Sequence, residues 1–285
     1  MSIDIHLLSE ADFDQIDEMM KAAYKVSFSR RRELERYLSF QPKSHPLVAS
    51  NDGELVGFGA ALNYGPFAYI GLMAVSPKSQ RRGVGGTILG RLLEWLDGIG
   101  CPTVLLDASY AGEPLYAKNG FTALDQTHVL RQTRKLELSR HVGSSIINVF
   151  SPEELSEICS FDAPFFGVDR KSLLRSYFGE FPSRTLLSRS NDHQINGFIV
   201  AQKRSLGPWV ASDPIVAEGL LSRAMEFTFD EAPTVVVSAL NEACLNLLFK
   251  NGFEITRSNR HMYKGKLVQR ARSTAIYGQA TMGFG

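Results

Sequence analysis

The sequence predicts an α/β protein of the α+β kind, made of two similar units that each contain a mixed, largely antiparallel sheet flanked by helices. A chain of 285 residues, 44% hydrophobic and 21% charged, has the length and composition of two soluble globular domains. Short strand-like runs alternate with helical periods in both halves, which is typical of sheets covered by helices. In addition, Asn119-Gly120-Phe121 recurs 132 residues later as Asn251-Gly252-Phe253, which indicates an internal repeat.

Overall charge and composition argue against several classes of function. The net charge is +1, which gives no general attraction to nucleic acid or to a membrane surface. No apolar run reaches the roughly 20 residues that span a bilayer, and the first residues lack a signal-like core, so we expect a cytoplasmic protein. Cys101, Cys159 and Cys244 are widely spaced and are expected to be reduced. The six histidines lack metal-binding spacing, so we expect no metal site.

The first half begins with a strand at residues 3–8 and a helix at 10–24, for which Ser9 and Asp12 form a capping pair. Asp52-Gly53 predicts a hairpin between two strands. The other elements expected in this half are a basic helix at 31–40, strands at 46–49, 54–63, 68–75, 103–107 and 128–134, and an amphipathic helix at 84–98.

A glycine-rich loop from Gln80 to Gly86 joins a buried strand to the start of the amphipathic helix. The first N–H groups of a helix have no intrahelical acceptor, and the helix dipole makes this end partly positive. Glycines let the backbone close around an anion, and Arg81 and Arg82 would add charge that neutralises a pyrophosphate. The segment therefore predicts a phosphate-binding site.

Two common phosphate motifs do not fit this loop. A P-loop requires a lysine after the glycines, and a dinucleotide fingerprint requires a glycine where Ile88 stands. Instead the loop resembles the signature [QR]-x-x-G-x-[GA] of the GNAT superfamily of acyl-CoA-dependent N-acetyltransferases, with Gln80, Gly83 and Gly85 at the fixed positions.

The flanking segments extend the resemblance over about fifty residues. A strand ending in V-S-P precedes the loop, and the helix after it carries L-L-E-W-L. The strand at 103–107 then leads into Tyr116 to Phe121, which is similar to the family's Y-x-x-x-G-F. The resemblance implies two tandem GNAT folds, with acetyl-CoA as cosubstrate.

The second half resembles a degenerate copy of the first. The repeat is offset by 132 residues at Asn119 but by 136 at Gly71, so four residues are missing where the first half has its glycine loop. Leu248 stands at the position of Tyr116. We expect an acetyl-CoA-binding domain at residues 1–138 and a degenerate domain at 145–285 that completes the acceptor cleft. The tail from residue 268 onward is either disordered or packed back onto the domains.

The resemblance also assigns roles to individual residues. The pantetheine arm would lie along the strand before the loop, and the pyrophosphate on the loop itself. The cofactor-binding residues implied are Met73, Ala74, Val75, Gln80, Arg81, Arg82, Gly83, Val84, Gly85, Gly86, Thr87 and Ser109.

Tyr116 matches the tyrosine that serves as general acid to the leaving thiolate, although a packing role is the alternative. The base is left open between Asp107 and water, since an aspartate at a strand end often binds N–H groups of the following turn. Asp162, Asp169 and Arg170 belong to a D-x-x-x-F-G-x-D-R stretch of tandem members. They line the acceptor cleft or form a salt bridge within a loop.

The activity implied is transfer of an acetyl group from acetyl-CoA to a primary amine of a small molecule or peptide. The rival hypothesis is a non-catalytic module that binds acyl-CoA as a signal. We expect neither a nucleic-acid nor a membrane partner, and either a monomer or a homodimer.

Overall fold

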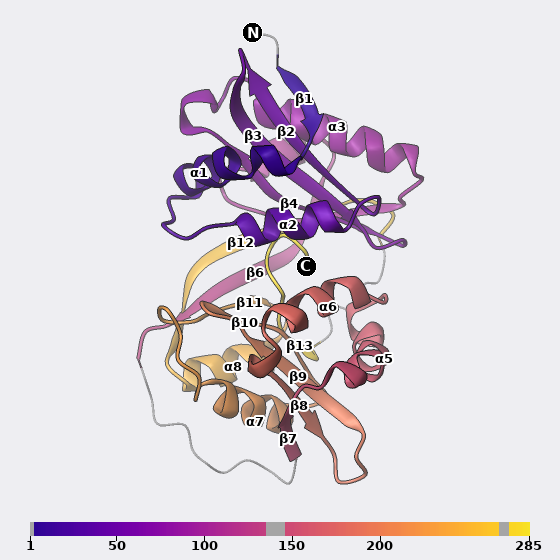
Figure 1. The fold of residues 1–285 in the computed structure, drawn as a ribbon, viewed down its shortest axis with the longest axis vertical. Coiled ribbons are helices and arrows are strands. Elements are labelled where there is room, and N and C mark those ends of the chain that lie inside the picture. Colours follow the sequence, from indigo (N-terminus) through magenta and orange to yellow (C-terminus); the bar gives the residue numbers. More distant parts are fainter. Residues whose placement is uncertain (1–2, 135–145, 268–273) are drawn as a thin grey trace.

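The computed structural model of the protein describes residues 3–134, 146–267 and 274–285, which form two halves stacked end to end (Figure 1). In both halves helices flank a mixed sheet, so the predicted fold class is confirmed. The main elements of the first half are β1 (Asp4–Leu7), α1 (Phe13–Tyr24), α2 (Arg31–Ser39), β2 (Ser44–Asn51), β3 (Glu54–Asn63), β4 (Ala68–Val75), α3 (Val84–Gly98), β5 (Thr103–Ala108), α4 (Glu113–Lys118) and β6 (Thr122–Gln132).

The second half repeats this order and then adds a short strand. Its main elements are β7 (Ile146–Val149), α5 (Leu155–Phe166), α6 (Lys171–Glu180), β8 (Thr185–Arg189), β9 (Ile195–Ala201), β10 (Ser205–Ala211), α7 (Pro214–Ala224), β11 (Thr234–Ser238), α8 (Glu242–Lys250), β12 (Phe253–Gly265) and β13 (Ile276–Gly278). No helix in the described ranges is both long and apolar enough to cross a membrane.

One sheet runs through both halves, because the halves exchange their last long strands. Among the described residues its strands lie in the order β1-β2-β3-β4-β5-β12-β6-β11-β10-β9-β8-β7, and β13 pairs with β10. β12 of the second half lies between β5 and β6 of the first, and β6 pairs in turn with β11. The strand expected near 128–134 exists as β6, but its partners belong to the second half.

Local predictions from the sequence hold closely in the first half. Ser9 and Asp12 form a capping box on a short 3-10 turn that leads into α1. Asp52 and Gly53 have φ of 51° and 81°, the two positive values that a tight hairpin of this kind requires. The boundary expected between residues 138 and 145 lies outside the described residues.

The hydrophobic core is continuous between the halves. One cluster packs α1 and α2 of the first half against α5 and α6 of the second, with Met20, Leu34, Leu174 and Phe178 at most 1% exposed. α3 covers the other face of the first sheet, because Ile88 packs with strand residues that alternate with those facing the second half. Burial across the junction therefore makes one folded body of the two repeats.

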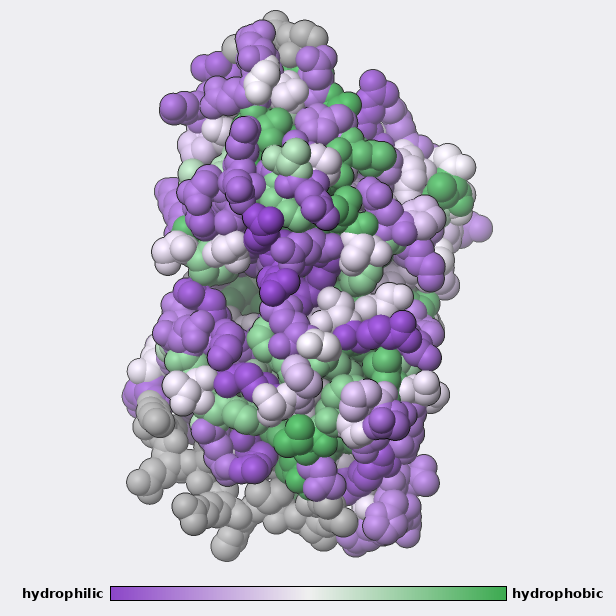
Figure 2. Space-filling view, in the orientation of Figure 1, coloured by the Kyte–Doolittle hydropathy of each residue, from purple (hydrophilic) through white to green (hydrophobic). Residues whose placement is uncertain are grey.

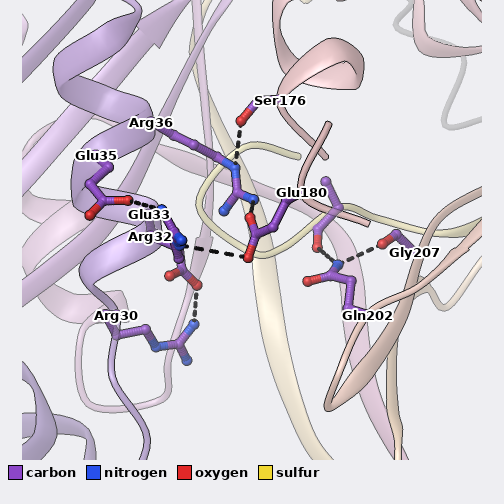
Figure 3. A network of polar contacts seen from close by, with 10 residues as sticks. Arg30, Arg32, Glu33, Glu35, Arg36, Ser176, Glu180, Gln202 and Gly207 are labelled. Atoms are coloured by element: carbon purple, nitrogen blue, oxygen red, sulfur yellow. Dashed lines mark hydrogen bonds and ion pairs between the residues drawn. The ribbon is translucent and has the colours of Figure 1, made fainter. Parts of the chain in front are cut away.

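A polar contact crosses the same junction between α2 and α6. Arg36, 6% exposed, donates from Nε to the Ser176 hydroxyl at 3.0 Å and from Nη2 to the Glu180 carboxylate (Figure 3). Its guanidinium also lies over the Tyr177 ring, with Cζ 3.9 Å from the ring centroid. The side chain thus contributes packing as well as charge.

Arg36→Ala is expected to lower the free energy of unfolding by about 2–4 kcal/mol, because it removes buried contacts and leaves Glu180 without its closest cation. Chemical denaturation measures the loss. Arg32→Ala is the matched control, since the Arg32 side chain is 69% exposed and its Nε lies 3.9 Å from the Glu180 carboxylate, near the limit for an ion pair. Its loss should stay below about 0.5 kcal/mol. Equal losses of unfolding free energy in both variants would show that Arg36 contributes no more to stability than Arg32.

The described part of the tail, 274–285, packs between the halves. Tyr277 and Phe284 are buried, and the Tyr37 hydroxyl of α2 donates to the Gly283 carbonyl. Gly283 presses on β4 so closely that a Cβ at Gly71 would lie 2.4 Å from its Cα. Only glycine at position 71 permits this approach. For these residues the packed alternative is confirmed.

Candidate active site

The loop before α3 leaves the start of that helix open. Gly83, the N-cap residue, has a left-handed φ of 89°, and no side chain caps the helix. Arg81 also has a positive φ, and both Arg81 and Arg82 are exposed. Because the first N–H groups of a helix have no intrahelical acceptor, this end offers several donors and two cations to an anion.

Two side-chain hydrogen bonds hold the loop in place. The Gln80 amide donates to the Val75 carbonyl at 3.2 Å, which ties the loop to the end of β4. The Thr87 hydroxyl donates to the Gly83 carbonyl at 3.2 Å and closes the first turn of α3. These two predicted binding residues therefore also fix the shape of the loop.

β4 and β5 diverge next to this helix start. They pair in parallel only at Ala68–Val104 and Tyr69–Leu105. Beyond these pairs the edge of β4 that faces β5, including Met73, Ala74 and Val75, has no strand partner among the described residues. Leu72 has a φ of 53°, and the β3–β4 register shifts nearby, so β4 is kinked where it separates. The two strands thus separate here, and the edge of β4 that faces this opening has no strand partner among the described residues.

Tyr116 lies on α4, close to the open helix start. A Cβ at Gly85 would lie 3.5 Å from Leu115, the residue before Tyr116, and 3.6 Å from Val75. Burial raises the pKa of Tyr116, so its phenol stays protonated well above neutral pH. Its hydroxyl makes no hydrogen bond to the described residues, whereas the Ser109 hydroxyl accepts from the Gly112 N–H at 3.2 Å.

Asp107, at the end of β5, sits in a buried polar cluster. Its carboxylate is fully buried and accepts from the hydroxyls of Tyr69 and Thr127, the latter at 2.6 Å. His261 of β12 lies with Nδ1 2.9 Å from the same carboxylate. A proton on Nδ1 would donate to this carboxylate and fix the orientation of the ring. A histidine of the second half is thus oriented beside the opening in the first.

His261 could not be predicted from the sequence, because 154 residues separate it from Asp107. No local motif marks it, and only the strand exchange brings β12 alongside β5. The same exchange places Asn259 next to the cluster, where its side-chain amide donates to the Asp107 carbonyl at 3.4 Å.

The three residues predicted in the second half have structural partners. Asp162 and Arg170 form a buried, bidentate ion pair with both N···O distances 2.7 Å. Arg170 lies over Phe166, whose ring contacts Tyr64 in the first half. Asp169 instead accepts from the Lys171 N–H at the start of α6. The structure brings Asp162 and Arg170 to the junction of the halves and leaves Asp169 exposed.

In the second half the equivalent anion site is occupied by the chain itself. The Asp213 carboxylate caps α7 and accepts from the N–H groups of Ile215 and Val216. β10 and β11 also diverge, but β13 pairs with β10 in the gap, and the Gln279 N–H donates to the Val236 carbonyl of β11. No open cleft of the first kind is left between these strands.

Family models of acetyltransferases match both halves of the sequence. The acetyltransferase (GNAT) family matches residues 13–121, and an acetyltransferase (GNAT) domain matches residues 158–278. A search of curated proteins finds no match to this chain.

Solved structures resemble the chain over nearly its whole length. A Pyrococcus horikoshii protein, provisionally described as an acetyltransferase, has 26% identity and a TM-score of 0.85 over 99% of this chain and 96% of its own. A tandem GNAT protein from the clavulanic acid biosynthesis pathway has 12% identity and a TM-score of 0.67 over 93% and 98%. A GCN5-related N-acetyltransferase from Sphaerobacter thermophilus has 14% identity and a TM-score of 0.67 over 92% and 95%. The last two similarities concern the fold alone.

Proposed function

Because both halves of this chain belong to the GNAT acetyltransferase family, we propose that it transfers an acetyl group from acetyl-CoA directly to a primary amine of a small molecule or peptide. The observation that carries the proposal is the contrast between the two helix starts. The start of α3 is open, whereas Asp213 closes the start of α7. The first half therefore binds acetyl-CoA, and the second half completes the acceptor site.

The open elements of the first half suit the parts of acetyl-CoA in order. The pyrophosphate binds the N–H groups and arginines of the loop at residues 80–87, where donors and positive charge coincide. The pantetheine arm lies along the free edge of β4 at Met73, Ala74 and Val75. A backbone N–H near Met73 then faces the thioester oxygen and stabilises the negative charge that develops there. Ser109 lies on the other side of the opening.

Proton removal from the amine is the costly step, since a lysine-like amine with a pKa of about 10.4 is protonated at neutral pH. The Asp107 carboxylate already accepts three hydrogen bonds, so it suits orientation of His261 better than direct proton transfer. In this proposal Nε2 of His261 takes the proton, directly or through water, and Asp107 stabilises the imidazolium that forms.

Tyr116 donates a hydrogen bond to the leaving thiolate. Since burial raises its pKa, full proton transfer to a thiolate of pKa about 8.5 is unfavourable, and hydrogen-bond donation is the better role.

Tyr116→Phe is expected to lower kcat about 10- to 100-fold, the worth of one hydrogen bond to a charged group, with the affinity for acetyl-CoA unchanged. Because a raised pKa keeps the phenol protonated, the rate–pH profiles of both proteins should have the same shape through the mildly alkaline range. Steady-state kinetics over pH measure both effects. An unchanged kcat would mean that Tyr116 only packs against Phe121.

The test of the function combines calorimetric titration with acetyl-CoA and amine-dependent release of free CoA. Binding together with CoA release from at least one amine in a broad panel supports the proposal. Binding without release from any amine favours the non-catalytic acyl-CoA module. Absence of acetyl-CoA binding overturns both.

A further inference from the structure

Arginines from three segments gather where the halves meet. Phe28, in the connection from α1 to α2, contacts the guanidinium groups of both Arg30 and Arg204, whose Cζ atoms are 4.8 and 4.4 Å from its ring centroid. Arg204 belongs to the turn between β9 and β10, so the two cations come from different halves. In Figure 1 the α1–α2 connection lies next to β12, and Figure 2 shows the surface hollowed at this level.

The third cation is Arg257 of β12. In register it lies opposite Val129 of β6, two residues from Arg131, which shares Glu231 with Arg204. Partial desolvation, and then the positive charge of Arg30, lower the pKa of Arg257. Nη2 of Arg257 contacts Sδ of Met282 at 3.3 Å, and no carboxylate of the described residues lies within ion-pair distance of it. Two like charges held together in this way favour an anion between them.

The carboxylates around these arginines do not balance them. Arg30 pairs with Glu33 at 3.0 Å (Figure 3), while Arg204 and Arg131 share Glu231. The Nε atoms of Arg30 and Arg204 are nevertheless buried without a hydrogen-bond partner in the described structure. Unpaired buried donors are unfavourable, and a bound anion would satisfy them.

The face of β12 that carries Arg257 is basic at one end of the strand and acidic at the other. Residues 257, 259 and 261 alternate onto one face, and in register Asp125 of β6 lies opposite His261. Asn259, 5% exposed, has its Oδ1 buried without a partner among the described residues. One end of this face is therefore basic, and the other holds two carboxylates, Asp107 and Asp125, about 13 Å away along the strand.

The basic end lies within reach of the proposed reaction centre. Arg257 and His261 are four residues apart on one face of β12, which corresponds to about 13 Å along the strand. An elongated acceptor anchored at the arginines can thus present its amine beside His261.

We propose that the acceptor amine carries a carboxylate or phosphate group, which Arg257 binds together with Arg30 and Arg204 while the amine lies toward His261 and Asn259. The inference rests on the proposed acetyl transfer and narrows its substrate to amines with a distant anionic group. Asn259 Oδ1 accepts a hydrogen bond from the amine, and the carboxylate end of the face favours its positive charge on arrival.

The test compares amines of equal length that differ in one terminal group: ω-amino carboxylates, ω-aminoalkyl phosphates and uncharged n-alkylamines. Wild-type kcat/KM should favour at least one anionic series over the alkylamines by about 10- to 100-fold, the worth of a charge-assisted hydrogen bond. The better series identifies the anionic group. Equal turnover of charged and uncharged amines would overturn the inference while leaving the proposed function intact.

Arg257→Gln should remove this preference by lowering kcat/KM for the anionic amines alone, and Arg257→Lys should restore part of it. Arg223→Gln is the matched control, because Arg223 lies on α7 and pairs with Glu226. If Arg257→Gln instead weakens acetyl-CoA binding, the arginines serve the cosubstrate and the inference fails.

A binding measurement separates this inference from the proposed function. Glutarate and inorganic phosphate should raise the melting temperature of wild type more than that of Arg257→Gln, whether or not acetyl-CoA binds. A difference between the two proteins supports the anion site. Equal shifts would mean that the anions bind elsewhere, and the inference would be wrong.

Discussion

Gly83→Glu is expected to weaken acetyl-CoA binding by at least about 100-fold, because it combines backbone strain of about 1–2 kcal/mol with a negative charge at the phosphate site. Gly83 has a φ of 89°, which side chains rarely adopt. The second half shows what a carboxylate does at a helix start, since Asp213 accepts from two N–H groups of α7. The introduced glutamate would occupy the α3 donors in the same way. Calorimetric titration with acetyl-CoA measures the effect.

Two further variants separate strain from charge. Gly83→Ala brings the strain without the carboxylate and should lose far less affinity than Gly83→Glu. Gly90→Ala, in the middle of α3 with nothing within 4 Å of the added Cβ, should bind as wild type does. If Gly83→Glu binds acetyl-CoA normally, the loop is not the pyrophosphate site.

His261→Gln is expected to lower kcat by about 10²–10⁴-fold, the usual contribution of a positioned general base. Glutamine keeps a hydrogen-bond donor toward Asp107 but cannot accept the amine proton. The affinity for acetyl-CoA should not change, because the loop and the edge of β4 are untouched. Steady-state kinetics and calorimetric titration on the same preparation measure the two quantities.

The control histidine is His128, which lies on the neighbouring strand and bonds Ser258 at 2.8 Å on the other face. His128→Gln should leave kcat unchanged. Asp107→Asn should also lower kcat, and the double variant with His261→Gln should lose little more, because the two residues act as a unit. Full activity of His261→Gln, with its fold verified by circular dichroism, would show that proton removal does not need this side chain.

The parts of the fold that could be predicted are those that neighbouring residues determine. The strand at 68–75 and the helix start after Gly83 were both read correctly, because periodicity and glycine placement act within a few residues. The degenerate second half could also be read, since the absence of a glycine loop is local. The capping role of Asp213 and the insertion of β13 beside β10 could not, because no residue near them in sequence requires either.

The candidate site was predicted only as far as one half of the chain determines it. Tyr116, Asp107 and the loop carry a recognisable local pattern, whereas His261, Asn259 and Arg257 reach the site through pairing of β12 with β5 and β6. Sequence alone suggested that each half closes its own sheet. Which of two equivalent last strands pairs with β5 depends on long-range packing, and no propensity of the strands themselves distinguishes the two.

The exchanged strands also determine the order in which the protein can fold. During synthesis, the edge of β5 that pairs with β12 stays unpaired until residues 253–265 have been made. The contact between Asp107 and Asn259, for example, joins residues 152 positions apart. Contacts of such sequence separation slow folding, because the entropy of closing the intervening chain is lost before they form. The first repeat therefore cannot complete its native sheet while the second is still being synthesised. The proposed acceptor side of the site, with His261 and Asn259, therefore forms only when the last long strand is in place.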